Sequence, residues 1–106
     1  MNTFVVSRLQ FIGYHRFKNA PHEVSFLRDW HRHVFYVQVM AKESESRQIE
    51  FILLKRRVGE FVEQEYNENS FEESCEQIAV SILNKFPELC EASVFEDNEN
   101  GAVVTR

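Results

Sequence analysis

Two histidines on alternate residues, His31 and His33, carry the strongest chemical signal in this sequence. They open a segment rich in valine and aromatic residues, which favours a β-strand. Because alternate side chains of a strand point to the same face, both imidazoles can reach one ion. His15 ends an earlier segment of the same kind and can supply a third nitrogen. Three histidines with one open coordination position are typical of a catalytic zinc site.

The histidine pair alone does not establish a metal site, because two histidines on alternate strand residues also occur without metal. His15 adds to the pair only if the two strands are neighbours. The fourth histidine, His22, follows Pro21 in an expected loop and is better explained as a solvated side chain. A domain with three incidental histidines stays open as the alternative.

Glu96 is the other residue with possible chemistry. It shares one face of an alternating segment, 90–97, with Ala92 and Val94. A carboxylate on an apolar face is costly to bury unless it accepts hydrogen bonds. The donors can belong to a ligand or to a neighbouring backbone, and the sequence favours neither.

The elements that must position these residues follow from periodicity and from turn signals. The patterns predict strands over about 3–15 and 31–42, a short strand or bridge over 47–50, helices over 51–65 and 71–86, and strands over 90–97 and 102–104. Pro21 interrupts the chain between the first two strands, and Pro87 ends the second helix. The expected order is β-β-α-α-β-β.

Two boundaries depend on local signals. Two capping boxes compete for the first turn of the second helix, Ser70 with Glu73 and Ser74 with Gln77. The Asn-Gly pair in 98–101 is a signal for a tight turn between the last two strands.

Length and composition indicate one globular domain over 1–106. The net charge of −5 argues against nucleic acid as the main partner, and no segment has the length and hydropathy of a membrane span or a signal peptide, so we expect a cytoplasmic protein. Cys75 and Cys90 lack the spacing of a metal or disulfide motif and are expected to be reduced. Four basic residues near the histidines either receive a small anion or are simply solvated: Arg16, Lys18, Arg28 and Arg32.

Five short segments resemble, in the right order, motifs of the 6-pyruvoyl-tetrahydropterin synthase and 6-carboxy-tetrahydropterin synthase family. The motifs are F-x-x-x-H-R-hydrophobic at 11–17, H-G-H at 31–33, hydrophobic-x-D-F-x-x-L-K at 49–55, T-S-E-N-L-A at 74–79 and V-x-E-T at 94–97. The resemblance implies the α+β tunnelling fold (T-fold), an antiparallel β-β-α-α-β-β arrangement with two helices packed on one face of the sheet. The element order expected from periodicity supports it independently.

The resemblance also implies a site. His15, His31 and His33 would bind zinc, and Glu96 would anchor the 2-amino-4-oxo edge of a pterin or purine-like ring. Subunits of this family assemble with their sites at subunit interfaces, so a homo-oligomer is implied. The substrate implied is 7,8-dihydroneopterin triphosphate or a related pterin, on which zinc acts as a Lewis acid.

The chain differs from the family at the motifs that transfer protons. No cysteine precedes His31 in 24–30, the L-D-H motif between the helices is missing, and Arg32 replaces the central glycine of H-G-H. Asp29 and His22 remain as possible bases, and nothing in the sequence singles out either. Two hypotheses follow: a zinc-dependent pterin synthase-like lyase, or a catalytically inactive T-fold oligomer that binds a pterin, purine or nucleotide-like ligand.

Overall fold

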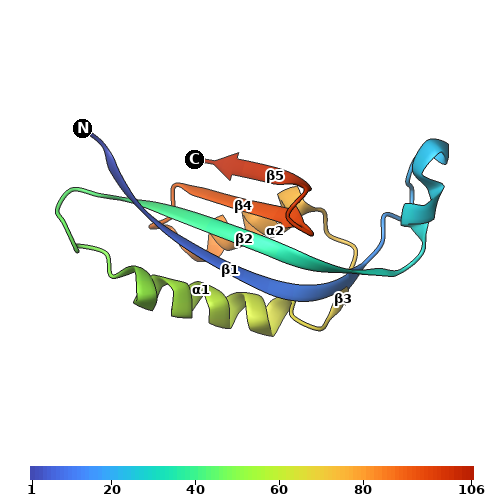
Figure 1. Ribbon diagram of the computed structural model, residues 1–106, viewed down its shortest axis with the longest axis horizontal. Helices are drawn as coiled ribbons and strands as arrows, with labels where there is room; N and C mark the ends of the chain where they lie inside the picture. The colour runs from blue at the N-terminus through green and yellow to red at the C-terminus, as the bar shows by residue number, and fades with distance from the viewer.

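The computed structural model describes residues 1–106 as one five-stranded sheet with two α-helices and a short 3₁₀ helix (Figure 1). In chain order the elements are β1 Thr3–His15, η1 His22–Arg28, β2 His31–Glu43, α1 Phe51–Glu65, β3 Ser70–Phe71, α2 Cys75–Lys85, β4 Glu91–Glu96 and β5 Asn100–Thr105. The strand order is β3-β1-β2-β4-β5, and every pairing is antiparallel except that of β3 with β1. The predicted α+β class is confirmed, and the predicted order of elements holds except for the two-residue strand β3 between the helices and the short helix η1.

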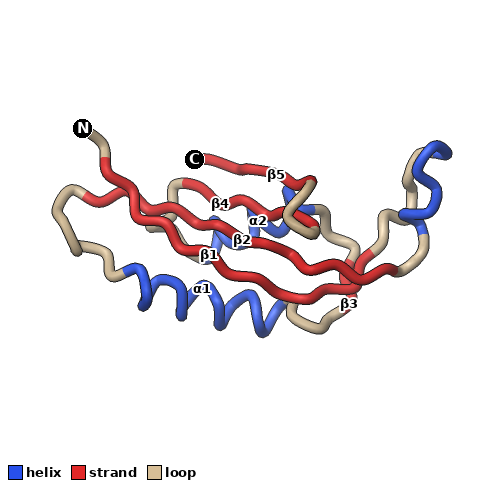
Figure 2. Tube along the Cα trace, viewed as in Figure 1, coloured by secondary structure: helices blue, strands red, loops and turns tan.

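β1 and β2 are the two longest strands of the sheet. Figure 2 shows them as two long strands that run side by side along the sheet. Their register is continuous from the pair Thr3 and Glu43 to the pair His15 and His31. The connection between them, 16–30, carries η1 and projects beyond the end of the sheet (Figure 1, light blue).

One face of the sheet is covered by both helices. The face of β2 that carries Phe35, Val37 and Val39 points toward the helices, since all three residues are buried. They belong to a single apolar core with the buried stripes of the helices, which are Leu54, Val58 and Val62 in α1 and Cys75, Ile78, Ala79, Ile82 and Leu83 in α2. This amphipathic packing fixes the face on which the site residues lie.

The second helix begins later than predicted. Its first turn is set by Ser74 and Gln77, which form the complete capping box, so α2 starts at Cys75. The residues before it form β3, where Phe71 pairs with His15. Phe71 buries its ring against Phe35 of the core, and this burial favours an extended backbone over an earlier helical turn.

The predicted short strand over 47–50 does not form. Residues 44–50 make turns instead, because the Gln48 side-chain carbonyl accepts hydrogen bonds from the backbone and hydroxyl of Ser44, and Arg47 adopts a positive φ of 62°. A polar side chain that bonds local backbone groups competes with strand pairing.

The last hairpin turns earlier than predicted. The tight turn is at Glu96–Glu99, where Glu99 N–H donates to the Glu96 carbonyl and the central residues Asp97 and Asn98 have φ of 50° and 57°. Asp and Asn tolerate this left-handed backbone better than most residues. Gly101 lies inside β5, where a Cβ would come within 2.1 Å of the Val94 carbonyl oxygen. The Asn-Gly signal therefore reflects close strand contact and not the turn.

No helix in the structure combines the length and the apolar character that crossing a membrane requires.

Candidate metal centre

The three predicted histidines meet at one end of the β1–β2 ladder. His15 faces His31 across the strands, and His33 is two residues further along the same side of β2. One ring nitrogen from each lies within 4.8 Å of the others. The ring centroids are 4.5 to 5.0 Å apart. The condition set by the sequence, that the two strands be neighbours, is met.

Hydrogen bonds to the far ring nitrogens fix the orientation of two imidazoles. His31 Nδ1 lies 2.8 Å from the backbone carbonyl oxygen of Asp29, and His33 Nδ1 lies 2.5 Å from Oδ2 of Asp97. A carbonyl and an ionised carboxylate only accept, so Nδ1 carries the proton and Nε2 keeps a lone pair. His15 is held by a backbone hydrogen bond at Glu73.

The three Nε2 atoms are buried and have no hydrogen-bond partner. Buried polar atoms normally have a hydrogen-bond partner. Three unpartnered lone pairs directed at one point therefore indicate a binding site for a cation. The carboxylate oxygens of Glu96 lie 3.3 Å from Nε2 of His15 and of His33, which is an ion pair only if a ring is protonated. With neutral rings, the donor set fits a zinc ion.

His15 is neutral at physiological pH. Burial, with smaller contributions from the neighbouring rings of His31 and His33, lowers its pKa from 6.5 to about 4. A neutral imidazole is the form that binds metal, so the environment of His15 prepares it as a ligand.

The pKa of His15 predicts a pH dependence for the metal-free protein. Between pH 6.5 and 4 the unfolded chain binds a proton at His15 that the native state does not, so the free energy of unfolding falls as pH falls. The loss reaches about 3 kcal/mol at pH 4 and is absent above pH 6.5. Urea unfolding with a chelator present, compared with His15→Gln, measures it; parallel pH profiles for the two proteins would contradict it.

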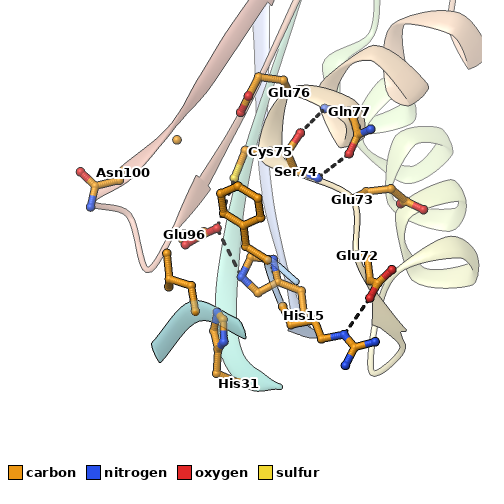
Figure 3. A pocket seen from close by; sticks show the side chains of 14 residues that line it. His15, His31, Glu72, Glu73, Ser74, Cys75, Glu76, Gln77, Glu96 and Asn100 are labelled. Atoms are coloured by element: carbon orange, nitrogen blue, oxygen red, sulfur yellow. Dashed lines mark hydrogen bonds and ion pairs between the residues drawn. The ribbon is translucent and has the colours of Figure 1, made fainter. Parts of the chain in front are cut away.

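A pocket opens beside the triad, between the end of β4 and the first turn of α2 (Figure 3). Figure 3 shows Glu96 between His15 and Cys75, with its carboxylate facing the pocket. Glu96 accepts a long hydrogen bond from the Cys75 thiol, with Sγ and Oε1 3.9 Å apart, and its side chain is 28% exposed. No backbone group donates to this carboxylate, so its remaining acceptor capacity faces the pocket.

Cys75 is not a reactive thiol. Burial, together with the nearby charge of Glu96, raises its pKa to about 12. A cysteine needs its thiolate to act as nucleophile or base. Cys75 therefore does not replace the cysteine that the resemblance leads one to expect before His31.

The state of Cys75 can be checked with a thiol reagent. At pH 8 only about one thiol in ten thousand is ionised when its pKa is about 12. We expect the Cys90→Ser variant, in which Cys75 is the remaining thiol, to react at least 100-fold more slowly when folded than in denaturant. Cys75→Ser serves as the control for Cys90, and equal folded and unfolded rates in Cys90→Ser would disprove the assignment.

Other predicted candidates lie away from the pocket or are already paired. The lining of the pocket includes neither His22 nor the Asp29 side chain. Arg28 gives two donors to the Ala20 carbonyl. Of the four basic residues, Arg16 alone lines the pocket, and it is bound to Glu72 at 2.7 Å.

Asp97 was missed as a site residue. The signal available was its position directly after Glu96, at the end of the predicted strand. Its role depends on the pairing of β2 with β4 and on the left-handed turn, and neither could be placed from spacing.

Comparison with known proteins rests on structure, since no protein-family model and no curated protein sequence matches the chain. The structure of 6-pyruvoyl tetrahydropterin synthase from Caenorhabditis elegans is similar over 100% of this chain and 96% of that chain, with a TM-score of 0.78 and 13% identity. An uncharacterized protein from Wolinella succinogenes is similar over 100% and 99%, with a TM-score of 0.82 and 12% identity. At these identities the likeness establishes architecture alone. The chain therefore has the tunnelling fold.

Proposed function

We propose that this protein is a zinc-dependent, 6-pyruvoyl/6-carboxy-tetrahydropterin synthase-like lyase acting on 7,8-dihydroneopterin triphosphate or a related pterin. The observation that carries the proposal is the convergence of three unpartnered Nε2 atoms, from His15, His31 and His33, beside a pocket that also holds Glu96. The structural similarity to a 6-pyruvoyl tetrahydropterin synthase and the motif order support it.

The protein residues divide the work between holding the metal and orienting the ring. The three histidines hold the ion, and when bound it supplies Lewis acidity toward hydroxyl groups of the substrate side chain. Glu96 accepts hydrogen bonds from the ring N–H and the 2-amino group of the pterin, since a carboxylate offers two acceptor oxygens in one plane. The buried Cys75 thiol donates a hydrogen bond to Glu96 and helps to hold its carboxylate in place.

Zinc content and product release test this proposal together. We expect about one zinc per subunit and triphosphate release from 7,8-dihydroneopterin triphosphate that stops when the metal is removed. Zinc without release, but with thermal stabilisation by pterins, would overturn the lyase. Absence of zinc after reconstitution would remove the metal centre.

The second candidate is a catalytically inactive oligomer that binds a pterin, purine or nucleotide-like ligand in the same pocket. It is favoured by the departures from the family's proton-transfer motifs, since Cys75 stays protonated and neither His22 nor the Asp29 side chain lines the pocket. Loss of a general base removes roughly two to four orders of magnitude in rate. Ligand binding without turnover would decide for this candidate.

Glu96→Gln tests the ring anchor. We expect the affinity for a pterin to fall about 5- to 150-fold, the equivalent of about 1 to 3 kcal/mol, because an amide presents a donor where the carboxylate accepts. The matched control is Glu76→Gln, a glutamate in the same pocket lining that, unlike Glu96, forms no ion pair with the triad. Calorimetric titration measures both, and equal affinities in the two variants would make Glu96 a structural residue.

Homo-oligomerisation forms part of the proposal. The sheet face opposite the helices exposes apolar side chains along β1, with Phe4 41% and Val6 39% exposed, and Tyr36, which is paired with Gln10, is 37% exposed further along the same face. Contact with another subunit would cover them. Light scattering of the purified protein measures the mass, and a monomer at micromolar concentration would contradict this part.

A further inference from the structure

The carboxylate of Asp97 is attached to the metal centre more firmly than a surface residue would be. Its Oδ2 lies 2.5 Å from His33 Nδ1, and its Oδ1 accepts a hydrogen bond from Val34 N–H at 3.0 Å. The Asp97 backbone N–H donates in turn to the Val34 carbonyl at 2.7 Å. Three hydrogen bonds therefore fix this residue against β2.

The hairpin turn is what brings Asp97 to this place. Its positive φ of 50° turns the chain directly after Glu96, so that the side chain lies along β2 beside the ligand histidine. The residue belongs to the C-terminal hairpin, whereas the histidines belong to β1 and β2. The β2–β4 pairing, which ends at Phe35 and Glu96, sets the distance between them.

Asp97 differs from the other groups that hold the histidines. The acceptors for His15 and His31 are backbone groups, of Glu73 and Asp29. The acceptor for His33 is a charged side chain, and it occupies the threonine position of the V-x-E-T motif that this segment resembles. A carboxylate strengthens an imidazole as a ligand more than a neutral acceptor does.

We propose that Asp97 is a positioning residue of the metal centre: it holds His33 in the Nδ1–H tautomer, aims its Nε2 at the shared point, and increases the affinity of the site for zinc. This inference rests on the zinc site of the proposed function. Its effect is expected in the binding of the ion, since residues of this kind commonly account for a 10- to 100-fold change in metal affinity.

Asp97→Asn is the sharpest test, with Asp29→Asn as the matched control. Asparagine tolerates the left-handed backbone and can still accept from Val34 N–H, so the turn is retained. Asp29→Asn makes the same charge change next to His31, whose acceptor is the backbone carbonyl and is untouched. Competition with a chromophoric chelator should show a 10- to 100-fold loss of zinc affinity in Asp97→Asn and less than a 3-fold change in Asp29→Asn.

A zinc affinity in Asp97→Asn equal to that of the parent would overturn the proposal. The same loss in both variants would also overturn it, because it would indicate a general effect of charge. A second measurement needs no metal: nitrogen chemical shifts of His33 in the chelated protein should report the Nδ1–H tautomer in the parent and a mixture in Asp97→Asn. An unchanged tautomer would refute the positioning role even if no zinc binds. Failure of the parent to bind zinc, with the tautomer shift present, would instead count against the proposed function alone.

Discussion

His31→Ala is expected to abolish stoichiometric zinc binding while leaving the fold intact. His31 is partly exposed at the start of β2, and its Nε2 is one of the three unpartnered nitrogens. Zinc in small protein sites contributes about 10 to 16 kcal/mol over four ligands, so one ligand accounts for roughly 3 kcal/mol. The affinity should therefore fall by about 100-fold or more. Zinc content after gel filtration measures the effect.

The control for His31→Ala is His22→Ala. His22 is the one histidine outside the cluster and lies on η1. We expect its replacement to leave one zinc per subunit. Full retention of zinc in His31→Ala would exclude the three-histidine centre, and a loss in His22→Ala would place a ligand on η1.

Of the substitutions proposed for this protein, Phe35→Ala should lower the free energy of unfolding the most. Phe35 is fully buried, stacks on Phe11 with ring centroids 4.8 Å apart, and lies edge-on to His15 and His33 at 5.3 and 5.9 Å. Phe-to-Ala changes in a core cost about 3 to 5 kcal/mol because the cavity closes only in part. The free energy of unfolding in urea, with chelator to remove the stabilisation by metal, should fall by that amount.

Phe26→Ala is the matched control for Phe35→Ala. Phe26 belongs to η1 and is 70% exposed, so the same truncation should cost less than about 1 kcal/mol. If the free energy of unfolding fell by less than about 1 kcal/mol in Phe35→Ala, Phe35 would not be a buried residue of the core.

The approach of His15 to the histidine pair depends on the β1–β2 pairing, which the sequence could state only as a condition. The shared face of His31 and His33, and that of Glu96 and Val94, could be predicted because each depends on short-range alternation. His31 and His33 share a face with Phe35, and Glu96 shares one with Val94, whichever strands lie next to them. The helix over Phe51–Glu65 was likewise predicted with correct bounds, since its apolar stripe has the helical period. These features require no knowledge of long-range contacts.

The features that were predicted incorrectly depend on competition between local signals and packing. Ser70 and Ser74 offered equivalent capping boxes, and burial of Phe71 decided between them. The Asn-Gly pair at 100–101 suggested a turn, but the approach of the β4 backbone to Gly101 is what excludes a side chain there. Asp97 contacts a residue 64 positions away, so its role could not be deduced from spacing.

The place of the histidine cluster in the chain has a consequence for local unfolding. The last β1–β2 pair, His15 with His31, directly precedes the long connection 16–30, so this end of the ladder carries the entropic cost of closing that loop. An ion bound by histidines of both strands would hold this end of the ladder together. Amide hydrogen exchange near Tyr14 and Arg32 should therefore slow markedly when zinc binds, while exchange near Val5 and Ala41, at the opposite end of the ladder, should change little.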